Sequence, residues 1–148
     1  MSPPAPRCPS RLRRGYAHPP VQSVAAALEV IASVAADPLG HETVALLMDA
    51  SRQGGTCLVV DGTEAPDAIS EVAEFVLASA GQQPSRVESV VLASVRPGRL
   101  APGAGDHWRW FDLRDRFDDA GIDLLDWLVV GDLVAVSMAQ LTDSRSLW

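Results

Sequence analysis

The chain has 148 residues, of which 47% are apolar, and a formal net charge of −7. This length suits one domain with a sizeable core, and the apolar fraction excludes disorder for the body of the chain. The first twenty residues hold four arginines and no acid, so subtracting them from −7 leaves −11 for the rest. Such an acidic body opposes broad binding to a phosphate backbone.

Residues 1–20 are rich in proline and arginine, which predicts a disordered tail before a domain at residues 21–148. The arginine cluster of this tail could contact nucleic acid or an acidic partner, although a solubilising tail is the simpler interpretation. The tail has no apolar core of a signal peptide, and no run approaches the roughly 18 apolar residues of a membrane span. Cys8 in the tail and Cys57 in an expected strand predict no disulfide, so we expect a cytoplasmic protein without membrane contact.

Helical periodicity of apolar residues predicts a first helix that begins after Ser23 as its N-cap and ends before Pro38. Short β-branched runs bounded by turn residues predict strands at residues 43–48 and 56–60. The remaining expected elements are a helix at residues 68–80, a hairpin of residues 122–130 and 133–136, and a terminal strap whose Trp148 covers an edge.

A strand, a long loop and a helix follow one another between residues 87 and 121. The run at residues 90–93 (VVLA) predicts a buried strand, and the prolines and glycines after it predict a loop. Asp106 then opens a helical pattern that stops at Gly121. Because sites in open α/β sheets form at the carboxyl ends of strands, we expect a site in this stretch.

The most specific residues follow this helix. Residues 121–132 read GIDLLDWLVVGD and residues 134–137 read VAVS. They resemble the C-terminal hairpin of the RadC-like branch of the JAB/MPN (JAMM metalloprotease) superfamily, with the approximate pattern GIxLLDHLIVGD followed by YVS. Residues 45–49 (ALLMD) and 62–63 (GT) resemble further pieces of that family, in consistent order. The resemblance implies an α/β fold, a single JAB/MPN-like domain with a mixed β-sheet flanked by helices.

The family's zinc site is a His-x-His-Pro run after the central strand, a serine and an aspartate at the next helix start, and a glutamate from an earlier strand. The matching run here is Ser94-Val95-Arg96-Pro97, and Asp106 falls near the family's aspartate. A catalytic zinc needs three protein ligands with lone pairs, and an arginine has no acceptor. The resemblance therefore implies a degenerate member without cofactor, a catalytically inactive binding or assembly module for a protein partner.

Other interpretations of the same residues stay open. Asp106 is either the family's leftover metal ligand or an ordinary helix N-cap, and the cap is the simpler interpretation. His41 and Glu42 lie near the position of the family's glutamate, with His41 the better aligned, although a polar strand end would explain both. His41, Asp106 and His107 could together form a rearranged zinc site of a JAMM-type hydrolase with substituted ligands. A role in DNA repair would follow from the family alone and is opposed by the acidic charge.

Two further expectations concern the start of this helix. Trp108, Trp110 and Phe111 crowd one turn, so we expect Trp108 to be partly exposed near the cleft, as a binding surface or as a lid. If the metal is absent, the carboxylate of Asp106 needs another positive partner. We therefore expect an Arg96–Asp106 ion pair at the position of the family's zinc.

Overall fold

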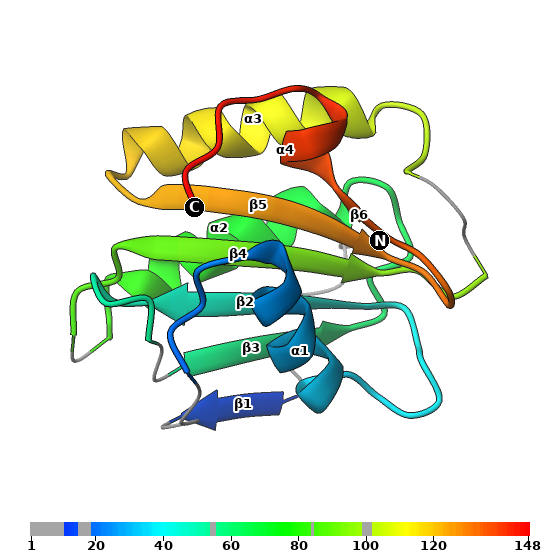
Figure 1. The fold of residues 1–148 in the computed structure, drawn as a ribbon, viewed down its shortest axis with the longest axis horizontal. Helices are drawn as coiled ribbons and strands as arrows, with labels where there is room; N and C mark the ends of the chain where they lie inside the picture. The colour runs from blue at the N-terminus through cyan, green and yellow to red at the C-terminus, as the bar shows by residue number, and fades with distance from the viewer. Residues whose placement is uncertain (1–10, 15–18, 54–55, 84, 99–101) are drawn as a thin grey trace, which may run out of the picture.

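A six-stranded sheet with helices on both faces forms the fold (Figure 1). The computed structural model describes residues 11–14, 19–53, 56–83, 85–98 and 102–148, with the backbone alone for Arg11–Arg14. In chain order the elements are β1 (Arg11–Arg14), α1 (Val24–Val34), β2 (Glu42–Met48), β3 (Thr56–Asp61), α2 (Ala68–Ala80), β4 (Ser89–Val95), α3 (Asp106–Asp119), β5 (Asp123–Val130), β6 (Ala135–Ser137) and α4 (Met138–Leu141).

The strand order is β1-β3-β2-β4-β5-β6. Only the β4–β5 pair is parallel among these strands, and the other neighbours are antiparallel. A parallel pair needs a long crossover, which the loop after β4 and helix α3 supply. The α/β class with a mixed sheet flanked by helices is therefore confirmed. Because Val95 pairs with Val130, β4 and β5 stop side by side at the same end of the sheet.

Two apolar clusters lie on the two faces of the sheet. Alternate residues of β2 and β4 belong to different clusters, as Leu46 and Val91 do on one face and Leu47 and Val90 on the other. Helix α1 packs on the first face, and α2 and α3 on the second. Figure 1 shows α1 in front of the sheet, α2 behind it and α3 running along β5. Burial on both faces explains why β4 is a continuous apolar run in the sequence.

The N-terminal edge differs from the expected disordered tail. Arg11–Arg14 form β1 and pair antiparallel with β3, with Arg11 opposite Val59 and Arg14 opposite Thr56. An edge strand is held by backbone hydrogen bonds, so no apolar pattern marks it in the sequence. Residues 1–10 and 15–18 lie outside the described residues.

The C-terminal part contains the expected hairpin, but its second strand begins later than predicted. Leu133 and Val134 lie in the turn, where the Gly131 N–H donates to the Val134 carbonyl oxygen over 2.8 Å. Further on, the expected terminal strap packs by Leu147 and Trp148 against the cluster on the α1 face. The turn thus leaves two apolar side chains outside the sheet.

Candidate functional site

A small cavity lies where β4 ends and α3 begins. It encloses about 130 Å³ and takes its walls from the chain before β2, the chain after β3, the loop after β4 and the first turn of α3. We call it the Arg96–Asp106 cavity. The lining residues are His41, Glu64, Pro66, Arg96, Gly103, Ala104, Asp106 and Arg109.

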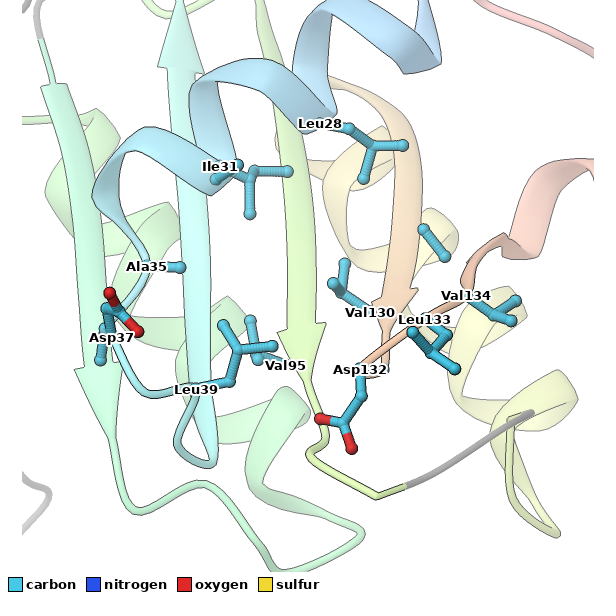
Figure 2. A pocket seen from close by; sticks show the side chains of 14 residues that line it. Leu28, Ile31, Ala35, Asp37, Leu39, Val95, Val130, Asp132, Leu133 and Val134 are labelled. Carbon is cyan, nitrogen blue, oxygen red and sulfur yellow. The ribbon is translucent and has the colours of Figure 1, made fainter.

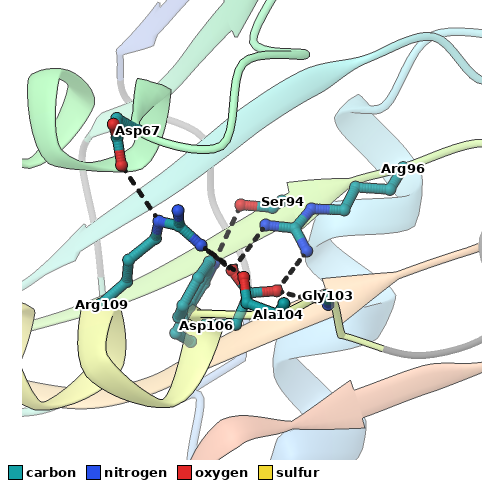
Figure 3. Close-up of polar contacts among 8 residues, drawn as sticks. Asp67, Ser94, Arg96, Gly103, Ala104, Asp106 and Arg109 are labelled. Atoms are coloured by element: carbon teal, nitrogen blue, oxygen red, sulfur yellow. Dashed lines mark hydrogen bonds and ion pairs between the residues drawn. The ribbon is translucent and has the colours of Figure 1, made fainter.

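The carboxylate of Asp106 accepts hydrogen bonds from two arginines and one backbone amide (Figure 3). Arg96 Nη1 lies 2.6 Å from Oδ2 and Arg96 Nη2 lies 3.4 Å from Oδ1. Arg109 Nη1 approaches Oδ1 at 3.1 Å, and the Gly103 N–H approaches Oδ2 at 2.7 Å. The side chains of Asp106 and Arg96 are 2% and 15% exposed. The predicted ion pair between Arg96 and Asp106 is therefore confirmed, and it is largely buried.

The surroundings of Asp106 favour its ionised form. Burial by itself raises the pKa of this carboxyl group. The hydrogen bond and positive charge of Arg96, the Gly103 N–H and Arg109 outweigh burial, so that the pKa of Asp106 lies below the ordinary aspartate value. The cavity thus contains a stable carboxylate whose charge is already matched.

The interpretation of Asp106 as the helix N-cap is wrong. The N-cap residue is Gly105, whose φ of 82° lies in the left-handed region that glycine adopts without strain. Asp106 is the first residue of α3, and its carboxylate accepts from Gly103 upstream instead of from an amide of the first turn. Two guanidinium groups and this amide therefore direct the carboxylate into the cavity and away from the capping position.

The side chain of Trp127 contacts Ser94 and Arg96, the residues at the two histidine positions of the His-x-His-Pro run. Ser94 Oγ accepts a hydrogen bond from the indole Nε1 of Trp127 over 2.9 Å. The guanidinium carbon of Arg96 lies 5.6 Å from the centroid of the same ring, within cation–π range. Pro97 lies in the turn that follows β4. The sequence reasoning missed Trp127, although this residue stands where the pattern GIxLLDHLIVGD has a histidine.

Arg109 is a second residue that the sequence reasoning missed. Its Nε lies 3.2 Å from Asp67 Oδ1, just before α2, and its Nη1 donates to the Ala104 carbonyl oxygen at 3.1 Å. Arg109 thereby joins the start of α3 to the start of α2. Its spacing of three residues from Asp106, which places both on one side of a helix, was the available signal.

The three alternative ligand candidates do not come together. His41 lines the Arg96–Asp106 cavity. Glu42 is buried on the opposite face of β2, where it accepts from the Ala36 N–H over 2.8 Å. His107 is exposed and does not line the cavity. Among the residues that the structure describes, no group of three His, Cys, Asp or Glu side chains is placed to hold a metal ion.

Trp108 is 80% exposed, whereas Trp110 is buried and Phe111 is half exposed. The prediction that Trp108 would be the exposed aromatic residue of this turn is confirmed. Its side chain does not line the Arg96–Asp106 cavity, so it is not a lid over it.

Another buried carboxylate lies in β5. Asp126 Oδ1 accepts from the backbone N–H groups of Trp127 at 2.8 Å and Ala139 at 3.1 Å, and Oδ2 accepts from the Ser137 hydroxyl. Burial raises the pKa of Asp126, and these hydrogen bonds only partly oppose that effect. Asp126 therefore ties β5 to β6 and α4, and the ion pairs of the described residues include none with its carboxylate.

No protein-family model matches this chain, and a search of curated proteins gives no match either. In the described part of the chain, no helix has both the length and the apolar character needed to cross a membrane.

Proposed function

We propose that the protein is a catalytically inactive, metal-free domain of the RadC-like JAB/MPN type that serves as a binding or assembly module for a protein partner. The observation that carries this proposal is the buried ion pair of Arg96 with Asp106, packed against Trp127. Under this proposal, the guanidinium group of Arg96 takes the place that the zinc ion has in the family. The same proposal includes the cytoplasmic location that the sequence predicts.

Electrostatics supports a metal-free cavity. A divalent cation next to Asp106 would lie close to the guanidinium groups of Arg96 and Arg109, whose charges repel it. Both carboxylate oxygens already accept hydrogen bonds from charged donors. Of the alternative ligands, only His41 lines the same cavity. Glu64 lines it too, but these side chains do not form a group placed to hold a metal ion among the described residues, and a zinc hydrolase would need them to move, because catalytic zinc has three protein ligands.

Surface chemistry supports a binding role. Trp108 is largely exposed and Phe111 is half exposed on the outer face of α3. Tryptophan is enriched among the residues that dominate binding energy in protein interfaces. The same face carries the carboxylates of Asp112, Asp115 and Asp119, which oppose binding to a phosphate backbone. A protein partner therefore fits this surface better than nucleic acid does.

Elemental analysis tests the metal-free state. Protein purified in the presence of zinc should contain no stoichiometric zinc. The Arg96→Ala variant is the informative control. Removing the guanidinium should still not create a site, because His41, Glu64 and Asp106 line the cavity without forming a group placed to hold a metal ion among the described residues. About one zinc per chain in the wild type, lost in Asp106→Ala or His107→Ala, would instead favour the hydrolase.

A further inference from the structure

An apolar groove of about 520 Å³ lies on the face of the sheet that α1 covers (Figure 2). We call it the α1-side groove. Leu28 and Ile31 reach into it from α1, and Val95 and Val130 enter it from the ends of β4 and β5. Leu39 closes one side and the turn between β5 and β6 closes the other.

The groove is open because helices cover the two faces of the sheet unequally. Helices α2 and α3 pack on one face, whereas α1 contributes the helical cover to the other. In the turn that follows β5, apolar side chains therefore remain at the surface. Leu133 is 90% exposed and Val134 is 44% exposed. Apolar surface gathered around a concave site is typical of protein interaction sites.

Two carboxylates and the C-terminal end of α1 place negative charge next to this apolar surface. The charged residues that line the groove are Asp37 and Asp132. Asp132 is held in place at the rim, because its Oδ2 accepts from the Gly98 N–H over 2.9 Å. The groove also meets the C-terminal end of α1, where the helix dipole is negative and no basic residue lies in the last turn. Two carboxylates and a helix end thus favour a cation next to the apolar walls.

This charge argues against a second copy of the chain as the occupant. A copy that docked by the same surface would bring two more carboxylates into the interface, and like charges placed together cost free energy. A basic segment would instead match the rim and the acidic body of the protein.

We propose that the α1-side groove binds a segment of a partner protein that presents an aliphatic side chain next to an arginine or lysine. The aliphatic side chain enters between Ile31 and Val130, and the cation lies near Asp37 and the end of α1. This inference rests on the proposed binding role and names the chemistry of the partner. Metal analysis tests the metal-free state and peptide titration tests the groove, so failure of one is distinguishable from failure of the other.

The test is fluorescence anisotropy of a labelled, blocked peptide of alternating arginine and leucine, titrated with the full chain. Ala35→Leu, which fills part of the groove, should weaken binding about tenfold. Leu133→Ser should weaken it as well, and since Leu133 is 90% exposed, this variant keeps the fold if Ala35→Leu does not. Asp37→Asn should weaken it by about two- to fivefold, the effect of one charge at a helix end.

Glu71→Gln is the matched control, because it removes the same charge from the exposed surface of α2, which packs on the other face of the sheet. It should leave the affinity unchanged, and a peptide with serine in place of leucine should bind weakly or not at all. Unchanged affinity in both Ala35→Leu and Leu133→Ser would overturn the proposal, as would equal weakening by Glu71→Gln and Asp37→Asn. A concentration-dependent dimer in sedimentation that Leu133→Ser abolishes would also overturn it and assign the groove to a second copy.

Discussion

The Arg96–Asp106 cavity and the α1-side groove lie at the same end of the sheet, on opposite faces, and they differ in what fills them. In the cavity, Asp106 accepts hydrogen bonds from Arg96, Arg109 and Gly103. In the groove, Leu133 and Val134 remain at the surface beside open space. The end of the sheet where β4 and β5 stop therefore carries a paired buried charge on one face and exposed apolar side chains on the other.

The difference follows from the cost of leaving each kind of group without a partner. A buried charge that lacks a partner is strongly destabilising, so the carboxylate of Asp106 must be paired within the chain when no metal is bound. An exposed leucine costs little, because a large share of every folded surface is apolar. The chain therefore pairs the Asp106 carboxylate with its own arginines, whereas the apolar side chains of the groove can stay exposed to solvent.

The largest effect should come from Asp106→Ala, which leaves two guanidinium groups without their buried carboxylate. We expect a loss of about 3–5 kcal/mol in the free energy of unfolding, measured by urea denaturation. The matched control is Asp132→Ala, an exposed carboxylate at the same end of the sheet, which should cost much less. A double-mutant cycle with Arg96→Ala should show a coupling energy, and additive effects would mean that the contact contributes nothing.

Leu125→Ala should have the next largest effect, a loss of about 2–4 kcal/mol in the free energy of unfolding. The variant loses the burial of the leucine side chain and leaves a cavity in its place. Leu125 is 1% exposed and belongs to the cluster on the α1 face. This variant probes the packed part of the face that also carries the groove. Thermal denaturation measures the effect, and an unchanged melting temperature would contradict the placement of this strand in the core.

The buried carboxylates of Asp106 and Asp126 should give opposite pH dependences. The pKa of Asp106 is below the ordinary value of 3.8 in the folded chain, so its contribution is present above pH 3.8 and is lost as the pH falls through the folded pKa. The pKa of Asp126 is raised, so the wild type loses stability as the pH rises from 3.8 through that pKa.

Asn variants separate the two cases. Asp106→Asn should cost about 1.5–3 kcal/mol at neutral pH, by loss of charged hydrogen bonds, and less in acid. For Asp126→Asn, the free energy of unfolding relative to the wild type should be most favourable at neutral pH. It should become less favourable as the pH falls, because the wild type then gains stability by protonation of Asp126. Urea denaturation across the acid range measures both, and parallel pH dependences would contradict the distinction.

The smallest effect on stability should come from Leu133→Ser. Because Leu133 is 90% exposed, we expect a change within about 0.5 kcal/mol in the free energy of unfolding. The same variant should weaken peptide binding at the α1-side groove. A large loss of stability would mean that Leu133 supports the fold. The α1-side groove would then differ less from the Arg96–Asp106 cavity, whose residues are needed for stability.

The sequence by itself determined the elements whose signals are local. Ser23 accepts from the Ala26 N–H as the predicted N-cap of α1. The β-branched run at residues 90–93 lies in β4, and Gly121, with a φ of 73°, follows the end of α3 as expected. The Arg96–Asp106 pair was also predictable, since a long side chain after a strand can reach the start of the next helix.

Only the tertiary structure decided which distant side chains meet. The parallel pairing of β4 with β5 places Trp127 against Ser94 and Arg96, and no spacing along the chain encodes that pairing. The edge strand β1 depends on backbone groups of β3 that the sequence does not display. The α1-side groove exists because α1 is the helix that the described residues place on that face, while the hairpin turn keeps Leu133 outside the sheet. Packing between layers, which determines such surfaces, is a property of the folded chain and not of any single segment.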